Sequence, residues 1–150
     1  MALIRFTKEG FEKLKKDYED LKNERPDAVE HLRKARDMGD LSENGYYKAS
    51  KAKLSSIDGR LWKMSMDIKH ALVIEDSKNS GVDIGKTVTL KNEQREMTYQ
   101  VVGDLEANPA EGKISLLSPI GKAVAGKQVN DEVKISTPSG EVAYTIIKLS

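Results

Sequence analysis

One short segment of the sequence concentrates acidic and basic side chains. Asp37, Asp40 and Glu43 fall within seven residues. Basic residues flank them on both sides, with Arg33, Lys34 and Arg36 before and Lys48, Lys51 and Lys53 after. Carboxylates are hard oxygen ligands suited to Mg²⁺, which prefers one or two carboxylates plus water and phosphate over a complete protein cage. Such a pair would bind metal weakly alone, but it could complete the ligand set of a metal that a partner holds and orient a water for attack on a phosphodiester.

The same residues also have a purely structural interpretation. Asp40-Leu41-Ser42-Glu43 matches a capping box, in which Asp40 is the N-cap of a following helix and Glu43 reaches back to the cap amide. Acidic residues are favourable at any helix N-terminus. The surrounding basic residues fit the solvated face of a coiled coil. Spacing alone therefore leaves both interpretations open.

Two helices must position this acidic segment. Apolar or small residues recur on both sides of it at alternating intervals of three and four, which is the heptad spacing of a coiled coil. The first series is Phe11, Leu14, Tyr18, Leu21, Arg25, Ala28, Leu32 and Ala35, and the second is Tyr47, Ser50, Leu54, Ile57, Leu61, Met64, Ile68 and Ala71. Because the connection is short, the helices must run antiparallel, as a hairpin on the order of 45 Å long with the acidic segment at its tip.

Individual residues of these helices carry further expectations. Thr7 is a candidate N-cap for the first helix, although Gly10 stands where a capping box would have Glu. Pro26 should kink or divide that helix, because it lacks an amide proton and clashes with the preceding turn. Trp62 and Met66 lie beside the second seam and are expected to be packing residues.

After about residue 75 the pattern changes to period two and to β-branched residues, which indicates strands. The expected strands are 87–90, 97–102, 113–116, 132–136 and 142–147. Ser118-Pro119 and Gly126 bracket one short helix, and the polar stretch 76–80 is the expected boundary. The sequence therefore predicts an α+β protein, with a coiled-coil hairpin in residues 1–75 and a β-rich domain in residues 76–150.

Composition excludes several classes of protein. Lys and Arg number 25 against 24 Asp and Glu, so the net charge of +1 offers no bulk attraction for nucleic acid. The absence of Cys excludes disulfides and thiolate sites, and His31 and His70, expected near opposite ends of the hairpin, cannot share a metal cage or a hydrolase triad. No apolar run approaches the ~18 residues of a membrane helix, and the start is too short for a signal peptide. A soluble, cytoplasmic protein is expected.

Several motifs together resemble the Gre transcript-cleavage factors, the GreA/GreB family of bacterial RNA polymerase. The tip motif is Ala35-Arg36-Asp37-Met38-Gly39-Asp40-Leu41-Ser42-Glu43-Asn44, followed by Tyr47, Ala49 and Gly59-Arg60. The other matching segments are Thr7-Lys8-Glu9-Gly10, Val102-Gly103 with Glu106, Ser118-Pro119-Ile120-Gly121-Lys122-Ala123 and Thr137-Pro138-Ser139-Gly140. They occur in the family's order and cover almost the whole chain.

The resemblance implies a coiled coil that enters the secondary channel of the polymerase and an FKBP-like domain that docks at the channel rim. Asp40 and Glu43 match the acidic pair that helps to hold the second catalytic Mg²⁺ and position a water, so that the polymerase itself cleaves the extruded 3′ end of backtracked RNA. Arg36 and Lys51 match basic positions that contact this RNA, where Lys51 replaces a common Arg and loses its bidentate phosphate geometry. The implied cofactor is Mg²⁺ held mainly by the polymerase, and the implied protein is not itself an enzyme. A monomer is expected, because a hairpin within the chain removes the need for a coiled-coil partner.

The chain departs from the family pattern at the tip. Where many members have Glu-Asn-Ala-Glu-Tyr, this sequence has Glu43-Asn44-Gly45-Tyr46-Tyr47, so Tyr46 replaces a carboxylate. This departure favours an alternative function, a channel binder that modulates or inhibits transcription without stimulating cleavage. A proline isomerase activity of the β-rich domain is disfavoured, because Tyr99 and Tyr144 are the aromatic residues it offers for a pocket.

Overall fold

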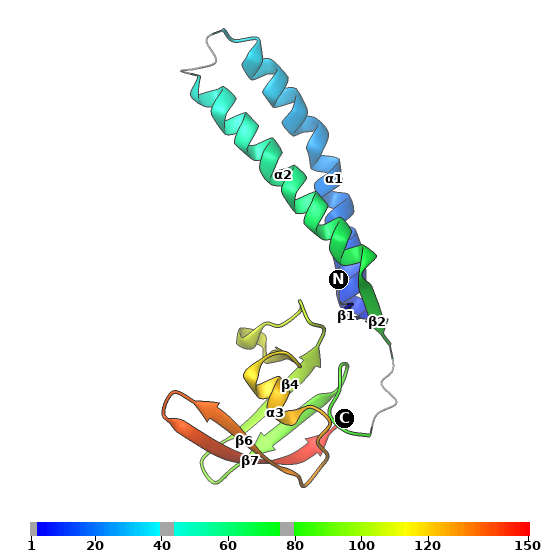
Figure 1. The fold of residues 1–150 in the computed structure, drawn as a ribbon, viewed down its shortest axis with the longest axis vertical. Coiled ribbons are helices and arrows are strands. Elements are labelled where there is room, and N and C mark those ends of the chain that lie inside the picture. The colour runs from blue at the N-terminus through cyan, green and yellow to red at the C-terminus, as the bar shows by residue number, and fades with distance from the viewer. Residues whose placement is uncertain (1–2, 40–43, 76–79) are drawn as a thin grey trace. The chain divides into compact units, whose positions relative to one another are not determined.

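The computed structural model describes residues 3–39, 44–75 and 80–150, and Figure 1 shows its helices and strands. The elements in chain order are β1 (Ile4–Thr7), α1 (Lys8–Arg36), α2 (Gly45–Lys69), β2 (Ala71–Ile74), β3 (Thr87–Lys91), β4 (Glu96–Val102), a 3₁₀ turn (Pro109–Glu111), β5 (Lys113–Ser115), α3 (Pro119–Val124), β6 (Glu132–Thr137) and β7 (Gly140–Leu149). The predicted α+β class is confirmed. The chain divides into two compact units, Glu12–His70 in one, and the residues up to Phe11 with Ala71–Ser150 in the other.

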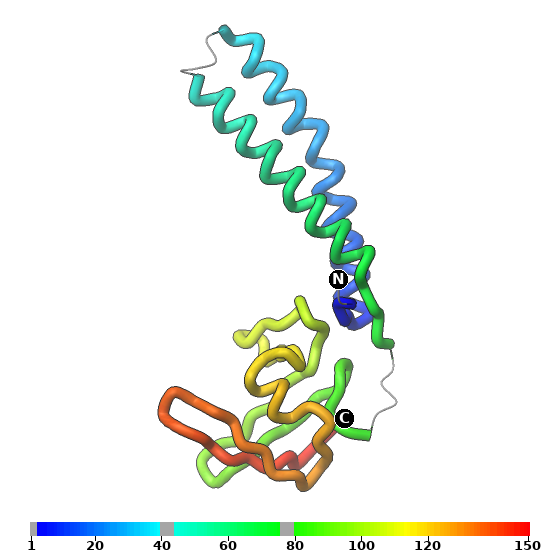
Figure 2. Tube along the Cα trace, in the orientation of Figure 1, coloured from blue at the N-terminus to red at the C-terminus, as the bar shows by residue number. Residues whose placement is uncertain are grey.

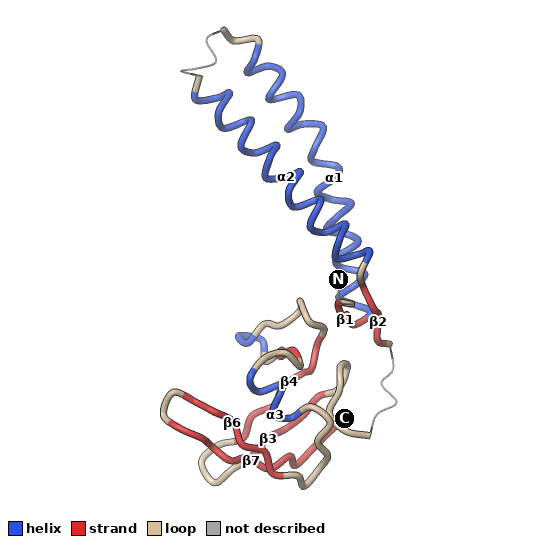
Figure 3. Tube along the Cα trace, viewed as in Figure 1, coloured by secondary structure: helices blue, strands red, loops and turns tan. Residues whose placement is uncertain are grey.

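Helices α1 and α2 form an antiparallel hairpin (Figure 3). Leu21 and Ala28 of α1 pack with Ile57 of α2 in one buried cluster, and Leu54, Leu61 and Met64 of α2 surround it. The other buried side chains of α1 are Leu32 and Ala35. All of these residues belong to the two predicted seams, so the heptad pattern is confirmed as the packing surface of the hairpin.

Pro26 does not divide the first helix, which continues from Lys8 to Arg36. Of the two expected outcomes, division of the helix is therefore wrong, because the loss of one helical hydrogen bond is offset by the packing of Leu21 and Ala28 on either side, and a kink at Pro26 stays a prediction. The preceding Arg25 interrupts the apolar seam and makes an ion pair with Asp58 of α2, with 2.6 Å between Nε and Oδ1. The hydrogen bond from Arg25 lowers the pKa of Asp58 below its ordinary value and raises the pKa of Arg25.

The second unit contains, within the described residues, a five-stranded sheet in the order β5-β4-β3-β7-β6. Figure 2 follows the path of this part of the chain from green through yellow to red. Its neighbours pair antiparallel except for β4 and β5, which are parallel. Val88, Leu90, Val101 and Ile146 are among its most buried side chains, and Val124 of α3 joins the same core. The predicted strands and the predicted short helix are confirmed.

Helix α3 begins as its sequence predicts. Ser118 is the N-cap, and its Oγ accepts a hydrogen bond of 3.1 Å from the amide of Gly121. Pro119 occupies the first helical turn, where its missing amide proton costs nothing. A local signal of three or four residues was therefore sufficient to place this helix.

Strands β1 and β2 were absent from the sequence interpretation. They pair in parallel, from Ile4 opposite Ala71 to Thr7 opposite Ile74. The second helix was expected to include Ala71, but it ends at Lys69 with His70 as its C-cap. Each strand has four residues, which are too few to show a period-two pattern. The two strands are also separated in sequence by both helices of the hairpin. Neither strand therefore has a local signature.

The start of α1 is capped by Thr7 together with a carboxylate that lies far away in sequence. The amide of Gly10 donates to Thr7 Oγ1 at 3.0 Å, which confirms Thr7 as the N-cap. The amide of Thr7 donates to Glu106 Oε2 at 2.8 Å, and the Thr7 hydroxyl donates to the same carboxylate. This is the hydrogen-bond pattern of a capping box. Its acidic member is Glu106 instead of a residue at position 10.

Two neighbouring contacts complete this cluster. The amide of Gly103 donates to Glu106 Oε2 at 3.0 Å. Arg5 of β1 pairs with Asp104, with 2.9 Å between Nη2 and Oδ1, and its amide also donates to that carboxylate at 2.8 Å. The segment after β4 thus supplies two carboxylates to β1 and to the first turn of α1. We call Arg5, Thr7, Gly10, Asp104 and Glu106, with Gly103, the Glu106 cluster.

Alanine substitutions at two helical glycines are expected to have opposite effects. Ala normally stabilises a helix over Gly by about 0.5–1 kcal/mol. A Cβ at Gly59 would meet open space, so Gly59→Ala should raise the free energy of unfolding by that amount. A Cβ at Gly10 would overlap the Glu106 carboxylate, so Gly10→Ala should lower it by about 1–3 kcal/mol. Urea unfolding followed by circular dichroism measures both, and a stabilised Gly10→Ala protein would contradict the Glu106 contact.

Candidate functional site

The candidate site lies where α1 ends at Arg36 and α2 begins at Gly45. Asp40 and Glu43, the predicted metal ligands, lie outside the described residues, so their assignment stays a prediction. The described residues next to them include Met38, which is exposed, and Gly39, whose φ of +106° is a left-handed value that glycine adopts readily. The backbone therefore leaves α1 through a turn in which Gly39 permits the change of direction.

The cap of α2 is Asn44. Its Oδ1 accepts a hydrogen bond of 3.0 Å from the amide of Tyr47. The interpretation of Asp40 as the N-cap and Glu43 as its capping-box partner is therefore wrong, since the helix begins later than that interpretation requires. Asn44 belongs to the tip motif of the sequence, which predicts no role for it. The signal that could have found it is the preference of Asn for N-cap positions.

Asn44 also connects the two helices. Its Nδ2 donates to the carbonyl oxygen of Ala35 at 3.1 Å, one residue before the end of α1. One amide side chain therefore satisfies the amide of Tyr47 at the start of α2, which lacks a helical partner, and adds a second donor to the Ala35 carbonyl, which also accepts from the amide of Met38 at 3.2 Å. This bridge sets the spacing of the helix ends between which the acidic segment is held.

The two predicted RNA contacts lie on opposite sides of the tip. Arg36 is the last residue of α1, and Lys51 is in the second turn of α2; both are exposed. The structure thus places the two basic side chains on the two helices that flank the acidic segment. Each is accessible from solvent.

Part of the charge around the tip is paired along α1. Arg33 makes ion pairs with Glu30 at 2.6 Å and with Asp37 at 3.0 Å. The hydrogen bond from Arg33 lowers the pKa of Glu30 below its ordinary value. Arg33 and Asp37 therefore behave as members of an exposed helical ion-pair network, which agrees with the solvated-face interpretation for these two residues.

Tyr46 presents a phenol ring where the family pattern has a carboxylate. It is the second residue of α2 and is 40% exposed. The sequence of this first turn contains no acidic residue. The beginning of α2 therefore lacks the negative charge that helix N-termini favour.

Trp62 is not a packing residue. It is 66% exposed, so the expectation that it packs beside the seam is wrong, whereas Met66 is half-buried. The heptad pattern places Leu61 in the seam, and Trp62 follows it directly, about 100° further round the helix. This rotation turns the indole toward solvent.

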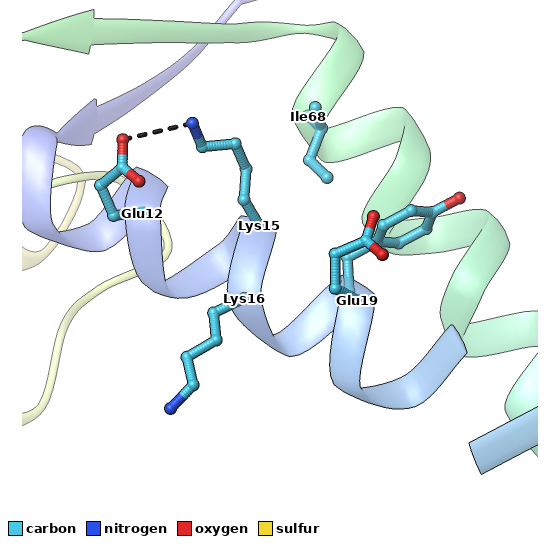
Figure 4. Close-up of a pocket in the computed structure, with 6 residues that line it drawn as sticks. Glu12, Lys15, Lys16, Glu19 and Ile68 are labelled. Atoms are coloured by element: carbon cyan, nitrogen blue, oxygen red, sulfur yellow. Dashed lines mark ion pairs between the residues drawn. The ribbon is translucent and has the colours of Figure 1, made fainter. Parts of the chain in front are cut away.

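A groove lies at the end of the hairpin away from the tip (Figure 4). It is lined by Glu12, Lys15, Lys16, Tyr18, Glu19 and Ile68. Glu12 and Lys15, one turn apart on α1, form an ion pair along its edge at 3.2 Å. Across the described residues as a whole, His, Asp and Glu side chains form no group of three that could hold a metal ion. Within the same ranges, none of the helices is long and apolar enough to cross a membrane.

Comparison with known proteins identifies the class. A family model described as "Transcription elongation factor, N-terminal" matches residues 4–73, and one described as "Transcription elongation factor, GreA/GreB, C-term" matches residues 77–150. The two models together define a two-part transcription elongation factor. The chain belongs to the GreA/GreB family.

Individual relatives agree along most of the chain. Transcription elongation factor GreA of Macrococcus caseolyticus is 44% identical over 149 residues, covering 96% of this chain and 94% of the relative. Transcription elongation factor GreA of Nitratiruptor sp. is 39% identical over 147 residues, covering 95% and 90%. Among solved structures, the GreA factor homolog 1 (Gfh1) of Thermus thermophilus has a TM-score of 0.48 at 25% identity, covering 99% of each chain.

Asn44→Ala should destabilise the hairpin. Loss of an N-cap acceptor costs about 0.5–2 kcal/mol, and the Ala35 carbonyl loses one of its two donors as well. Asn44→Asp keeps the acceptor and loses the donor, so its effect should be smaller. Thermal unfolding followed by circular dichroism measures both, with Asp40→Ala as the matched control. An Asp40→Ala protein destabilised as much as Asn44→Ala would restore the capping-box interpretation.

Proposed function

We propose that this chain binds bacterial RNA polymerase through the secondary channel and stimulates the polymerase's own Mg²⁺-dependent cleavage of backtracked RNA 3′ ends. Arrested elongation complexes would thereby be rescued. The observation that carries this proposal is a narrow helical hairpin whose tip segment contains Asp40 and Glu43 and whose second helix is capped by another residue, Asn44. The family and the relatives named GreA support it.

The dimensions of the hairpin suit insertion into a channel. The 29 residues of α1 and the 25 of α2 correspond to lengths of about 43 and 37 Å. The hairpin is two helices wide, and its apolar seam is closed within the chain. A second copy is therefore not needed to bury the seam, and we propose that the protein acts as a monomer in the cytoplasm, where the polymerase works.

The chain would contribute ligands and contacts instead of a complete active site. The carboxylates of Asp40 and Glu43 would add oxygen ligands to a Mg²⁺ held mainly by the polymerase, an ion that supplies charge stabilisation and water activation for phosphodiester cleavage. Arg36 and Lys51 would contact phosphates of the extruded RNA. Arg36 can do so through two parallel N–H donors and Lys51 only as a point charge. In this proposal the factor is not an enzyme, because the bond is cleaved in the polymerase's own site.

A second function is supported by Tyr46. With a phenol ring exposed in the first turn of α2 and no acidic residue in that turn, the tip carries fewer carboxylates than the family pattern. A factor of this kind could occupy the channel and modulate or inhibit transcription without accelerating cleavage. The two functions share the polymerase-binding step and differ in the chemistry at the tip.

Replacing both tip carboxylates should separate binding from cleavage. In a defined backtracked complex with Mg²⁺, the wild-type chain should accelerate RNA cleavage. Asp40→Asn/Glu43→Gln should reduce that acceleration by at least about 10–100-fold, the scale of losses at metal-site groups. The isosteric changes should leave the affinity for polymerase, measured by competition, within about twofold, because each replacement keeps the size of the side chain and removes only its charge. Wild-type protein that binds yet leaves cleavage at its intrinsic rate would exclude the cleavage function and favour the channel modulator.

Tyr46→Glu should increase cleavage. The new carboxylate would lie in the first turn of α2, where it also stabilises the helix N-terminus by about 0.3–1 kcal/mol. The cleavage rate in the same backtracked complex should rise several-fold, whereas Tyr46→Gln, which has a similar size and no charge, should not raise it. Equal rates for the Glu and Gln variants would show that Tyr46 does not limit the activity.

A further inference from the structure

Neither the packing of the seam nor the acidic tip explains why the indole of Trp62 is exposed. Trp62 is the chain's one tryptophan, and 66% of its surface is accessible to solvent. A single exposed apolar side chain is ordinary on a protein surface. The residues on the same face of α2 make this one different.

Trp62 lies in a row with three lysines. At 100° per residue, Lys48, Lys51, Ser55, Trp62 and Lys69 fall within about 60° of one another around α2. All five are exposed. We call this row the Trp62 stripe. Between Lys51 and Trp62 it contains the small side chain of Ser55, and the neighbours of Trp62 one turn toward the tip are Gly59, which has no side chain, and Asp58.

Helix α2 carries a local positive charge that the whole chain does not. Its 25 residues include six Lys or Arg and two Asp, whereas the net charge of the chain is +1. Asp58 is paired with Arg25 of α1 at 2.6 Å, and Asp67 is buried and paired with Lys63 at 2.9 Å. Asp67 lies outside the Trp62 stripe, and Asp58, four residues before Trp62, lies about 20° beyond its edge, where the pair with Arg25 offsets its charge. The stripe therefore presents lysines and an aromatic ring to solvent.

We propose that the Trp62 stripe binds single-stranded RNA, with a base stacked on Trp62 and phosphates near Lys48, Lys51 and Lys69. Exposed aromatic rings set among cations are the features by which proteins hold single strands without sequence preference. Eleven residues separate Lys51 from Trp62, a rise of about 16 Å along α2, so the stripe extends the RNA contact at Lys51 by a few nucleotides away from the tip. The identity of this RNA as the extruded 3′ segment rests on the proposed function.

A negatively charged protein surface is the competing occupant. Lysines would attract it as they attract RNA, but an acidic surface has no need for a flat, two-sided aromatic ring flanked by small residues. Nucleobases stack on such a ring whatever their sequence. The indole therefore favours the single strand, and the experiments below give the two occupants different outcomes.

Binding of RNA can be measured without the polymerase. Because Trp62 is the one tryptophan, its fluorescence should be quenched when a short single-stranded RNA oligonucleotide is titrated into the full chain. A duplex RNA of the same length should quench it less, because its bases are not free to stack. The affinity should fall steeply with added salt, as expected for phosphate contacts. No quenching at saturating RNA and low salt would overturn the proposal.

Four variants test the geometry with a fluorescently labelled RNA and anisotropy. Trp62→Ala should weaken binding about tenfold, and Trp62→Phe should recover most of that loss, because stacking requires an aromatic face. Ser55→Glu places a carboxylate between Lys51 and Trp62 and should weaken binding about two- to fivefold. Ser55→Gln is the matched neutral control and should bind like wild type. Equal affinity for Trp62→Ala and wild type would overturn the proposal, and circular dichroism checks that each hairpin is folded.

Backtracked elongation complexes test the stripe in place. Trp62→Ala should slow factor-dependent cleavage in complexes whose extruded RNA is long enough to reach Trp62, and not in those with the shortest extruded RNA. If wild-type protein fails to stimulate cleavage at all, the proposed function is wrong. The RNA titrations still show whether the Trp62 stripe binds RNA. If Trp62→Ala weakens polymerase binding equally for every RNA length and the free RNA does not bind, the stripe contacts protein and the proposal is wrong.

Discussion

The hairpin depends on one thin apolar seam between α1 and α2. The side chains that fill its centre are Leu21, Ala28 and Ile57, and much of the remaining surface of the two helices is charged. Each helix covers the seam of the other, so the outward faces remain in water and are available to partners. Where the seam is interrupted at Arg25, an ion pair with Asp58 replaces apolar contact. A hairpin built in this way is narrow, and that is what the proposed insertion into a channel requires.

The Glu106 cluster solves a different problem, which is how a long helix begins. Gly10 stands at the position where a capping box would have Glu, and Glu106 supplies the missing carboxylate from 99 residues beyond Thr7. The capping carboxylate thus comes from Glu106 instead of from a side chain at position 10. This contact forms only when β1 and the segment after β4 are both folded. The bare backbone of Gly10 and Gly103 makes room for that carboxylate. The start of α1 is thereby coupled to the folding of the β-rich unit.

The fold and the activity of this chain are carried by separate sets of residues. Asn44 holds the helix ends together at the tip, whereas Tyr46, Lys51 and Trp62 are exposed residues of α2. Substitutions at exposed helical positions rarely affect stability by much. The family framework can therefore be retained while the charge of the tip and its proposed contacts with RNA change. Tyr46 and Lys51, which depart from the family pattern, are both at such positions.

The sequence by itself determined the elements whose signals are local. The two heptad series predicted the hairpin, period-two segments predicted β3 to β7, and Ser118-Pro119 predicted α3, because spacing, propensity and capping act over a few residues. The tip motif predicted the family and the candidate ligands Asp40 and Glu43, whose role stays a prediction. Only the tertiary structure decided what depends on distant partners: the pairing of β1 with β2, the capping of α1 by Glu106, and the continuity of α1 through Pro26. The structure also decided that Asn44 caps α2 and that Trp62 is exposed. Hydrogen bonding fixes where a helix begins, and packing fixes whether a residue beside the seam is buried. A one-dimensional pattern contains neither.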